Sequence, residues 1–128
     1  MRLLLDTHAL IWWLRGDPRL GASARRAIED RRNDILVSAV SAFEVTTKHR
    51  LGKLPEAEIL AQDFDGERRQ EGFLALDVTI AHAALAGKLP GAHRDPFDRL
   101  LIAQALVEGL TLVSNEALFD GFGVQRLW

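Results

Sequence analysis

The sequence predicts an α/β fold with a short, mainly parallel sheet of four or five strands flanked by helices. Short, continuous apolar runs recur along the chain, and such runs are typical of strands that are buried on both faces. Segments with helical spacing separate these runs, and this alternation favours parallel strands joined by right-handed crossovers. Because no internal repeat or linker divides the chain, we expect a single domain over residues 1–128.

The predicted strands are four clear apolar runs and a weaker one near the end of the chain. They span residues 3–5, 35–37, 73–76, 111–113 and 124–127. Asp6 and Asp77 come directly after their strands, and Glu116 comes shortly after the fourth. The carboxyl ends of parallel strands share one edge of the sheet, where open α/β sheets place their ligands. Asp6 and Glu116 are therefore expected on that edge, with Asp77 as a further candidate.

The predicted helices fill the intervals between these strands. They span residues 7–14, 23–32, 38–48, 56–71, 80–86, 97–108 and 117–119, with Ser38 or Ser41 as the start of the third. Gly109 is suited to end the helix 97–108, because glycine readily adopts the left-handed conformation of a helix C-cap. His82, on the helix 80–86, is interpreted as a structural histidine.

The composition limits the compartment and the partners. The chain has no cysteine, which excludes disulfides and zinc–thiolate sites and fits a reducing cytoplasm. No signal peptide is evident, and no stretch approaches the ~20 apolar residues of a membrane-spanning helix. The formal net charge is −2, so binding of nucleic acid would require a local basic patch or a metal ion.

The stretch Asp95–Arg99 places two acids where a helix begins. Asp95 is a good N-cap, and Pro96 suits the first helical position, where its missing N–H is not needed. Asp98 then falls on the first turn. One interpretation is a well-capped core helix. The other is that Asp98 faces a cleft and holds a metal, in which case a site role for Asp95 is secondary to its role as the cap.

Four acids are candidates for one cluster. Asp6 and Glu116 share the carboxyl edge of the sheet, and Asp98 and Glu44 could reach it from their helices. Crowded carboxylates raise one another's pKa unless a cation neutralises them, and oxygen-only ligands suit Mg²⁺ or Mn²⁺. The alternative is that Asp6 only caps the helix after it, and that Glu44 is an ordinary exposed helix former.

A metal site of this kind hydrolyses a phosphodiester through an activated water and needs no nucleophilic side chain. Lys48, Arg50 and Lys53 could hold an anionic backbone, or could simply complement the C-terminus of their helix. Arg99, beside the cluster, could contact phosphate or balance the acids; the alternative is a surface ion pair that contributes little.

Taken together, four segments resemble the PIN-domain proteins. The segments are Leu3–Trp13; Ser41–Val45 with Lys48 and Leu51–Leu54; Asp95–Arg99 with Ile102–Ala105; and Leu112–Glu116 with Phe119 and Phe122. They follow one another in order over nearly the full chain. The compact form is most similar to the VapC toxins of bacterial and archaeal toxin–antitoxin pairs, and the resemblance implies a PIN-like three-layer fold.

The resemblance implies a Mg²⁺- or Mn²⁺-dependent endoribonuclease that cuts RNA, is kept inactive by a cognate antitoxin and is commonly a homodimer. By motif, Asp6 and Asp98 correspond to the principal metal ligands, and Glu44 to an acid of the same site that binds the metal directly or through water. Glu116 stands where the family usually has aspartate, and its extra methylene favours contact through water. Ser114 stands where threonine is common, and it keeps the hydroxyl.

Other interpretations stay open. An aspartate after the first strand also opens the haloacid-dehalogenase-like phosphatases, where it is a nucleophile, but these need a second aspartate two positions later, and this chain has His8 there. A PIN-like nuclease in RNA processing and a non-catalytic RNA- or protein-binding module share the same scaffold. Four large aromatic residues could line an antitoxin groove or a dimer seam, although core positions are favoured. They are Trp12, Trp13, Phe119 and Phe122.

Overall fold

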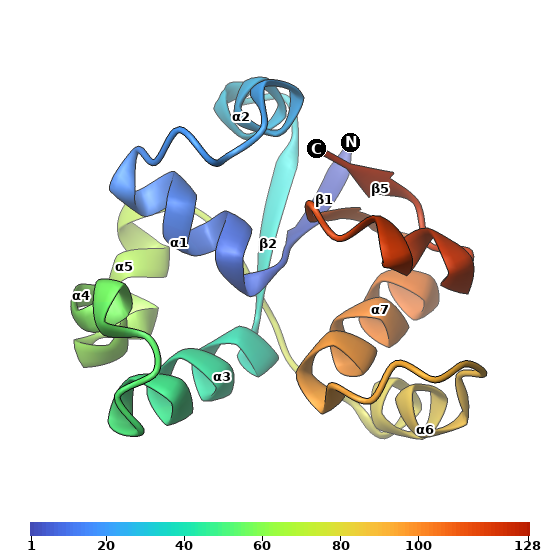
Figure 1. Cartoon of the computed structure of the whole chain (residues 1–128). Coiled ribbons are helices and arrows are strands. Elements are labelled where there is room, and N and C mark those ends of the chain that lie inside the picture. The colour runs from blue at the N-terminus through green and yellow to red at the C-terminus, as the bar shows by residue number, and fades with distance from the viewer.

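The computed structural model describes residues 1–128 and contains one five-stranded sheet with helices on both sides (Figure 1). The strands are β1 (Arg2–Leu5), β2 (Asp34–Ser38), β3 (Leu74–Leu76), β4 (Thr111–Val113) and β5 (Arg126–Leu127). Their order across the sheet is β3-β2-β1-β4-β5, and every neighbouring pair is parallel. The predicted fold class is confirmed, and all five predicted strands are present.

The helices form a layer on each face of the sheet. They are α1 (Thr7–Arg15), α2 (Ala22–Glu29), α3 (Ala39–Arg50), η1 (Pro55–Ala57), α4 (Glu58–Gln62), α5 (Phe64–Glu71), α6 (Ile80–Lys88), α7 (Pro96–Glu108) and η2 (Ala117–Phe122). Figure 1 shows α1, α4 and α5 on one side of the strands and α6 and α7 on the other. None of these helices combines the length and the apolar character needed to cross a membrane.

Each face of the sheet has its own hydrophobic core, and β1 contributes to both. Leu3 and Leu5 point into the core beneath α1, α2 and α4, whereas Leu4 points into the core beneath α7. All three leucines are 0% exposed, which is why β1 is a continuous apolar run rather than an alternating one. Burial of each side chain stabilises the fold by about 2 kcal/mol. Helix α3 bridges the two cores through Val45 and Val40.

The four aromatic residues named above belong to the two cores or pack against them. Trp12 and Phe119 are buried, one in each core. Trp13 and Phe122 are partly buried and pack against the same cores. The core interpretation of these four side chains is confirmed.

The predicted helix 56–71 is wrong as a single element, because the chain forms η1, α4 and α5 there. Asp63 makes the second break: its backbone is not helical, with φ −151° and ψ 72°, and its carboxylate accepts a hydrogen bond from the Gly66 N–H at 3.1 Å. A short acidic side chain that bonds the backbone three residues later begins a new helix more readily than it continues an old one. The apolar spacing across residues 59–64 conceals this break.

Several other boundaries differ from the prediction by a few residues, and the ends of three helices are examples. Helix α2 ends at Glu29 rather than at 32, because the Asp30 carboxylate accepts the backbone N–H of Arg32 at 3.0 Å. Helix α6 continues to Lys88. The 3₁₀ helix η2 continues through Gly121 to Phe122 and ends at Gly123, whose φ of +79° suits glycine.

Helix α7 begins and ends where the sequence places its signals. The Asp95 carboxylate accepts the N–H groups of Phe97 and Asp98, at 2.9 and 3.3 Å, with Pro96 on the first turn. Gly109 ends the helix with φ +65°. These local signals fix the direction in which the first turn of α7 presents its side chains.

His82 is a structural residue, as predicted. Its ring is fully buried, its Nδ1 accepts the Thr79 N–H at 3.0 Å, and its Nε2 lies 2.9 Å from the Glu108 carboxylate. Since Nδ1 accepts, the ring proton is on Nε2 and is donated to Glu108. The histidine therefore joins the start of α6 to the end of α7.

The three central strands end in register at the carboxyl edge of the sheet. The residues at this edge are Ser38 of β2, and Asp6 and Ser114 directly after β1 and β4. The Asp6 N–H continues the ladder by donating to the Val113 carbonyl at 3.0 Å. This edge carries the polar side chains from which the site is built.

Candidate active site

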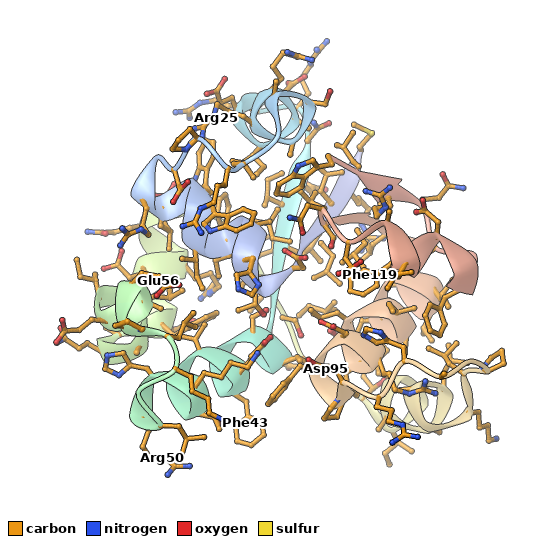
Figure 2. The ribbon with its side chains drawn as sticks, in the orientation of Figure 1. Arg25, Phe43, Arg50, Glu56, Asp95 and Phe119 are labelled. Carbon is orange, nitrogen blue, oxygen red and sulfur yellow. The ribbon has the colours of Figure 1, made fainter.

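A cleft of about 160 Å³ lies at the carboxyl edge of the sheet. Its lining is almost entirely polar, and Phe119 is the one apolar side chain in it. The lining residues are Asp6, Thr7, His8, Glu44, Lys48, Asp95, Asp98, Asn115, Glu116 and Phe119. Helix α3 packs on both α1 and α7, which brings three acids from distant parts of the chain together. Figure 2 shows Asp95 where the start of α7 meets α3.

Asp6 lies deepest of the acids on the sheet edge and is only 8% exposed. It caps α1, because its Oδ1 accepts the Ala9 N–H at 2.8 Å. Burial raises the pKa of Asp6 to about 6, although hydrogen bonds from the Ser114 hydroxyl and the Ala9 N–H oppose the shift. Asp6 therefore caps α1 and also lines the cleft. A nearby cation would favour the ionised carboxylate.

Glu44 is a buried acid rather than an exposed helix former, at 4% exposure. The Thr7 hydroxyl donates to Glu44 Oε1 at 2.6 Å, and the Lys48 ammonium lies 2.5 Å from Oε2. The Ser41 hydroxyl lies 3.0 Å from that of Thr7 and completes the group. These contacts orient the carboxylate and leave each of its oxygens with a strong donor.

Asp98 projects into the cleft from the first turn of α7. Its Oδ2 lies 2.9 Å from His93 Nε2. Burial raises the pKa of Asp98; the hydrogen bond from His93 lowers it, and the negative charges of Asp95 and Glu44 raise it further. Asp98 therefore lies near two other negative charges of the cleft lining.

Glu116 lines the cleft from the start of η2. It serves as the N-cap of η2, with a long hydrogen bond of 3.4 Å from the Leu118 N–H to its Oε1. Ser114 does not line the cleft. It is fully buried behind it, where its hydroxyl accepts the Glu116 N–H at 3.1 Å. Ser114 therefore hydrogen-bonds the Asp6 carboxylate and the Glu116 backbone from the buried side of the cleft.

Two expected candidates lie elsewhere. Arg99 contacts neither the cleft nor a surface acid: its guanidinium donates to the carbonyls of Ala86, Leu89 and His93. Arg99 therefore fixes the loop between α6 and α7. Asp77 is also absent from the cleft, and its carbonyl accepts a hydrogen bond from Gln104. Asp77 follows β3, an edge strand that is separated from the central strand β1 by β2.

Two residues that orient the acids were not singled out from the sequence. Thr7 holds Glu44, and His93 holds Asp98. The available signals are their positions, since Thr7 directly follows Asp6 and His93 lies five residues before Asp98. Neither position predicts a side-chain contact, because the partner of Thr7 is 37 residues away in sequence.

The donor chemistry of the cleft suits a hard divalent cation. Five carboxylates line it, and burial penalises the charge of Asp6 and Asp98, which a cation would offset. In the present side-chain arrangement, no three Asp, Glu or His side chains are gathered closely enough to hold an ion. A metal bound through Glu44 Oε2 or Asp98 Oδ2 would displace Lys48 or His93 from that oxygen.

The chain matches the PIN domain over residues 3–123. Ribonuclease VapC22 of Mycobacterium tuberculosis is 30% identical over 115 residues, which cover 89% of this chain and 86% of that relative. Ribonuclease VapC16 of the same organism is 44% identical over 71 residues, which cover 52% of this chain and 50% of that relative. The second match therefore spans about half the length of its relative.

The fold also resembles that of a solved complex. VapBC2 from Rickettsia felis, bound to a DNA fragment from their promoter, gives a TM-score of 0.72 at 20% identity, covering 99% of this chain and 98% of that chain. This likeness concerns the fold, whereas the domain match and the VapC22 alignment concern the sequence. The two relatives found by sequence are both named VapC ribonucleases. Because the domain match covers nearly the whole chain, the chain belongs to the PIN-domain family.

Proposed function

We propose that this protein is an endoribonuclease of the VapC type that hydrolyses RNA phosphodiester bonds with the help of Mg²⁺ or Mn²⁺. One observation carries the proposal: Asp6 caps α1, Glu44 lies in the middle of α3 and Asp98 lies on the first turn of α7, yet all three line one cleft. This is the set of acids that the family resemblance assigns to the metal. The ribonuclease names of the two relatives support the choice of RNA as the substrate.

In this proposal Asp6, Asp98 and Glu44 hold the ion, with Glu116 in contact through water. When bound, the divalent ion activates water as a nucleophile and offsets charge on the phosphate. The chain's own residues supply orientation. The hydrogen bond from the Ala9 N–H orients Asp6, and the Thr7 hydroxyl orients Glu44.

His93 and Asp95 orient the third ligand. Asp95 sets where α7 begins, and therefore where Asp98 points, while His93 holds one carboxylate oxygen of Asp98. Arg99 contributes indirectly, because it bonds the His93 carbonyl and so fixes the loop that carries this histidine. Substrate contact by Arg99 is not part of the proposal.

The partners are proposed on the same basis. We expect a cognate antitoxin that keeps the nuclease inactive, as in the VapBC pairs that the chain resembles, and the fold likeness to VapBC2 supports this expectation. The homodimer implied by the resemblance and the cytoplasmic location suggested by the cysteine-free sequence stay predictions. Expression with and without a small neighbouring gene would test the antitoxin, since a toxin arrests growth unless its partner is present.

A non-catalytic binding module is the second candidate. The observation in its favour is that Glu44 and Asp98 already have protein partners in Lys48 and His93. The phosphatase interpretation has less support. Asp6 is buried and fixed as a helix cap, and His8 occupies the position where those enzymes need a second aspartate.

The decisive experiment is cleavage of total RNA by the purified protein in Mg²⁺, in Mn²⁺ and in EDTA. We expect cleavage only with divalent ions, and a loss of about a hundredfold or more in Asp98→Asn. Asp34→Asn is the matched control, because Asp34 is exposed at the start of β2, outside the cleft. Undiminished cleavage by Asp98→Asn would refute the proposal, and saturable RNA binding without cleavage by the wild type would favour the binding module.

A further inference from the structure

Lys48 is the one lysine or arginine side chain that lines the acidic cleft. Its ammonium lies 2.5 Å from Glu44 Oε2 and 5.6 Å from the centre of the Phe97 ring. The side chain is 29% exposed, so its stem lies along the wall of the cleft while its charge reaches the acids. Lys48 is thus placed where a cation bound to Glu44 would be.

The surroundings of Lys48 are strongly acidic. Its ammonium bonds Glu44, and Asp95 and Asp98 line the same cleft. Lys48 partly neutralises a group of acids that has no arginine among its lining residues.

This pair differs from an ordinary ion pair between residues four apart on a helix. Such pairs are usually exposed, and solvent screens them. Here Glu44 is buried, and its other oxygen is occupied by the Thr7 hydroxyl. A cation that binds Glu44 through Oε2 must therefore displace Lys48.

We propose that Lys48 and the divalent ion exchange places on Glu44. Lys48 is the resident counter-ion of the cleft, and its displacement frees an ammonium on a flexible stem to hold the substrate phosphate beside the ion. The proposal rests on the proposed function, since it assumes that the cleft takes a metal. It assigns Lys48 two positions, one on Glu44 and one on the phosphate, and makes metal binding the event that moves it.

The test is a titration of Mn²⁺ into Lys48→Gln, followed by calorimetry or by the electron paramagnetic resonance of free Mn²⁺. Because the competing ammonium is gone, we expect Mn²⁺ to bind about tenfold more tightly than to the wild type. Without divalent ions the variant should melt at a lower temperature in low salt, since the acids lose their counter-ion. Lys88→Gln is the matched control, because Lys88 is exposed at the end of α6.

The second arm is substrate binding and cleavage. Lys48→Gln should cleave RNA more slowly at saturating Mn²⁺, and the dependence of log Kd on log salt for RNA should become shallower by about one. Lys48→Arg keeps the charge and should restore much of the wild-type Mn²⁺ affinity, which also covers the case in which the glutamine variant folds poorly.

The outcomes separate the two proposals. Unchanged or weaker Mn²⁺ binding by Lys48→Gln, with Lys48→Arg no different from it, would overturn the exchange even if the wild type is a nuclease. A wild type that binds Mn²⁺ but cleaves no RNA would overturn the proposed function, while tighter Mn²⁺ binding by the glutamine variant would still support the exchange.

Discussion

Two sets of aspartates in this chain have pKa values shifted in opposite directions from the usual value. Away from the cleft, Asp17 and Asp30 each bond the guanidinium of an arginine two residues later, at 2.8 Å, and this lowers the pKa of both carboxyls to about 2. In the cleft, burial raises the pKa of Asp6 to about 6 and raises that of Asp98 as well. The ionised form of aspartate is therefore stabilised by its partners at Asp17 and Asp30 and destabilised by burial in the cleft.

The difference lies in the partners. Asp17 and Asp30 have arginines that neutralise them. The cleft acids have a threonine hydroxyl, a backbone N–H and a histidine ring, which orient a carboxylate, and a single lysine that carries a full charge. An acid cluster that is oriented but under-neutralised favours an added cation, at a cost in stability when none is bound.

The largest expected effect on stability comes from Asp6→Asn. Asparagine can still cap α1. Because the folded pKa of Asp6 is about 6, above its usual 3.8, its contribution to folding is full at low pH and is lost as the pH rises through 6. Relative to the wild type, the variant should therefore gain about 2–3 kcal/mol between pH 4 and pH 8.

Denaturant unfolding of both proteins in EDTA, at several pH values, measures this gain. If the difference in free energy of unfolding between the wild type and Asp6→Asn stays constant with pH, burial does not penalise the Asp6 charge, and the contrast between the two sets of aspartates is wrong. Addition of Mn²⁺ at pH 8 should reverse the order by stabilising the wild type more than the variant.

A smaller effect is expected from Thr7→Val, which removes the hydroxyl donor of Glu44 while keeping the shape of the side chain. A buried carboxylate oxygen left without its donor costs about 1–3 kcal/mol. Thr46→Val on α3 is the matched control, because the Thr46 hydroxyl bonds only backbone carbonyls on an exposed face. Equal melting temperatures for the two variants would show that Thr7 does not hold Glu44.

The smallest effect is expected from Asp30→Asn. This acid is partly exposed and its partner Arg32 is exposed, so solvent screens the pair; the melting temperature should barely change and RNA cleavage should stay at the wild-type rate. Circular-dichroism melting and the total-RNA assay measure both. A clear loss of cleavage would contradict this expectation, because it would mean that the Asp30–Arg32 pair takes part in RNA binding or cleavage.

The sequence predicts the sheet and the direction of its helices because those signals are local. An apolar run of three leucines, a proline after Asp95 and a glycine after Glu108 each act within a few residues. The same locality explains the error at residues 56–71, where the apolar spacing and the capping aspartate Asp63 gave conflicting signals. There the capping hydrogen bond prevailed.

The candidate acids could also be named in advance, since Asp6 and Glu116 follow strands and Asp98 starts a helix. Their grouping on one cleft agrees with that expectation, and their role in catalysis stays a proposal. The position of Arg99 could not be predicted, because an arginine next to an acid can turn toward it or away. Here three backbone carbonyls of a neighbouring loop provide the better set of acceptors.

By itself, then, the sequence determined a parallel α/β fold and a set of acids at the ends of its elements. Only the tertiary structure decided which donor each acid receives: Thr7 and Lys48 on Glu44, and His93 on Asp98. The physical reason is that strand and helix signals depend on neighbours in sequence, whereas the partner of a buried carboxylate depends on which segments pack beside it. That packing also decides whether a lysine is a surface charge or the counter-ion of the cleft.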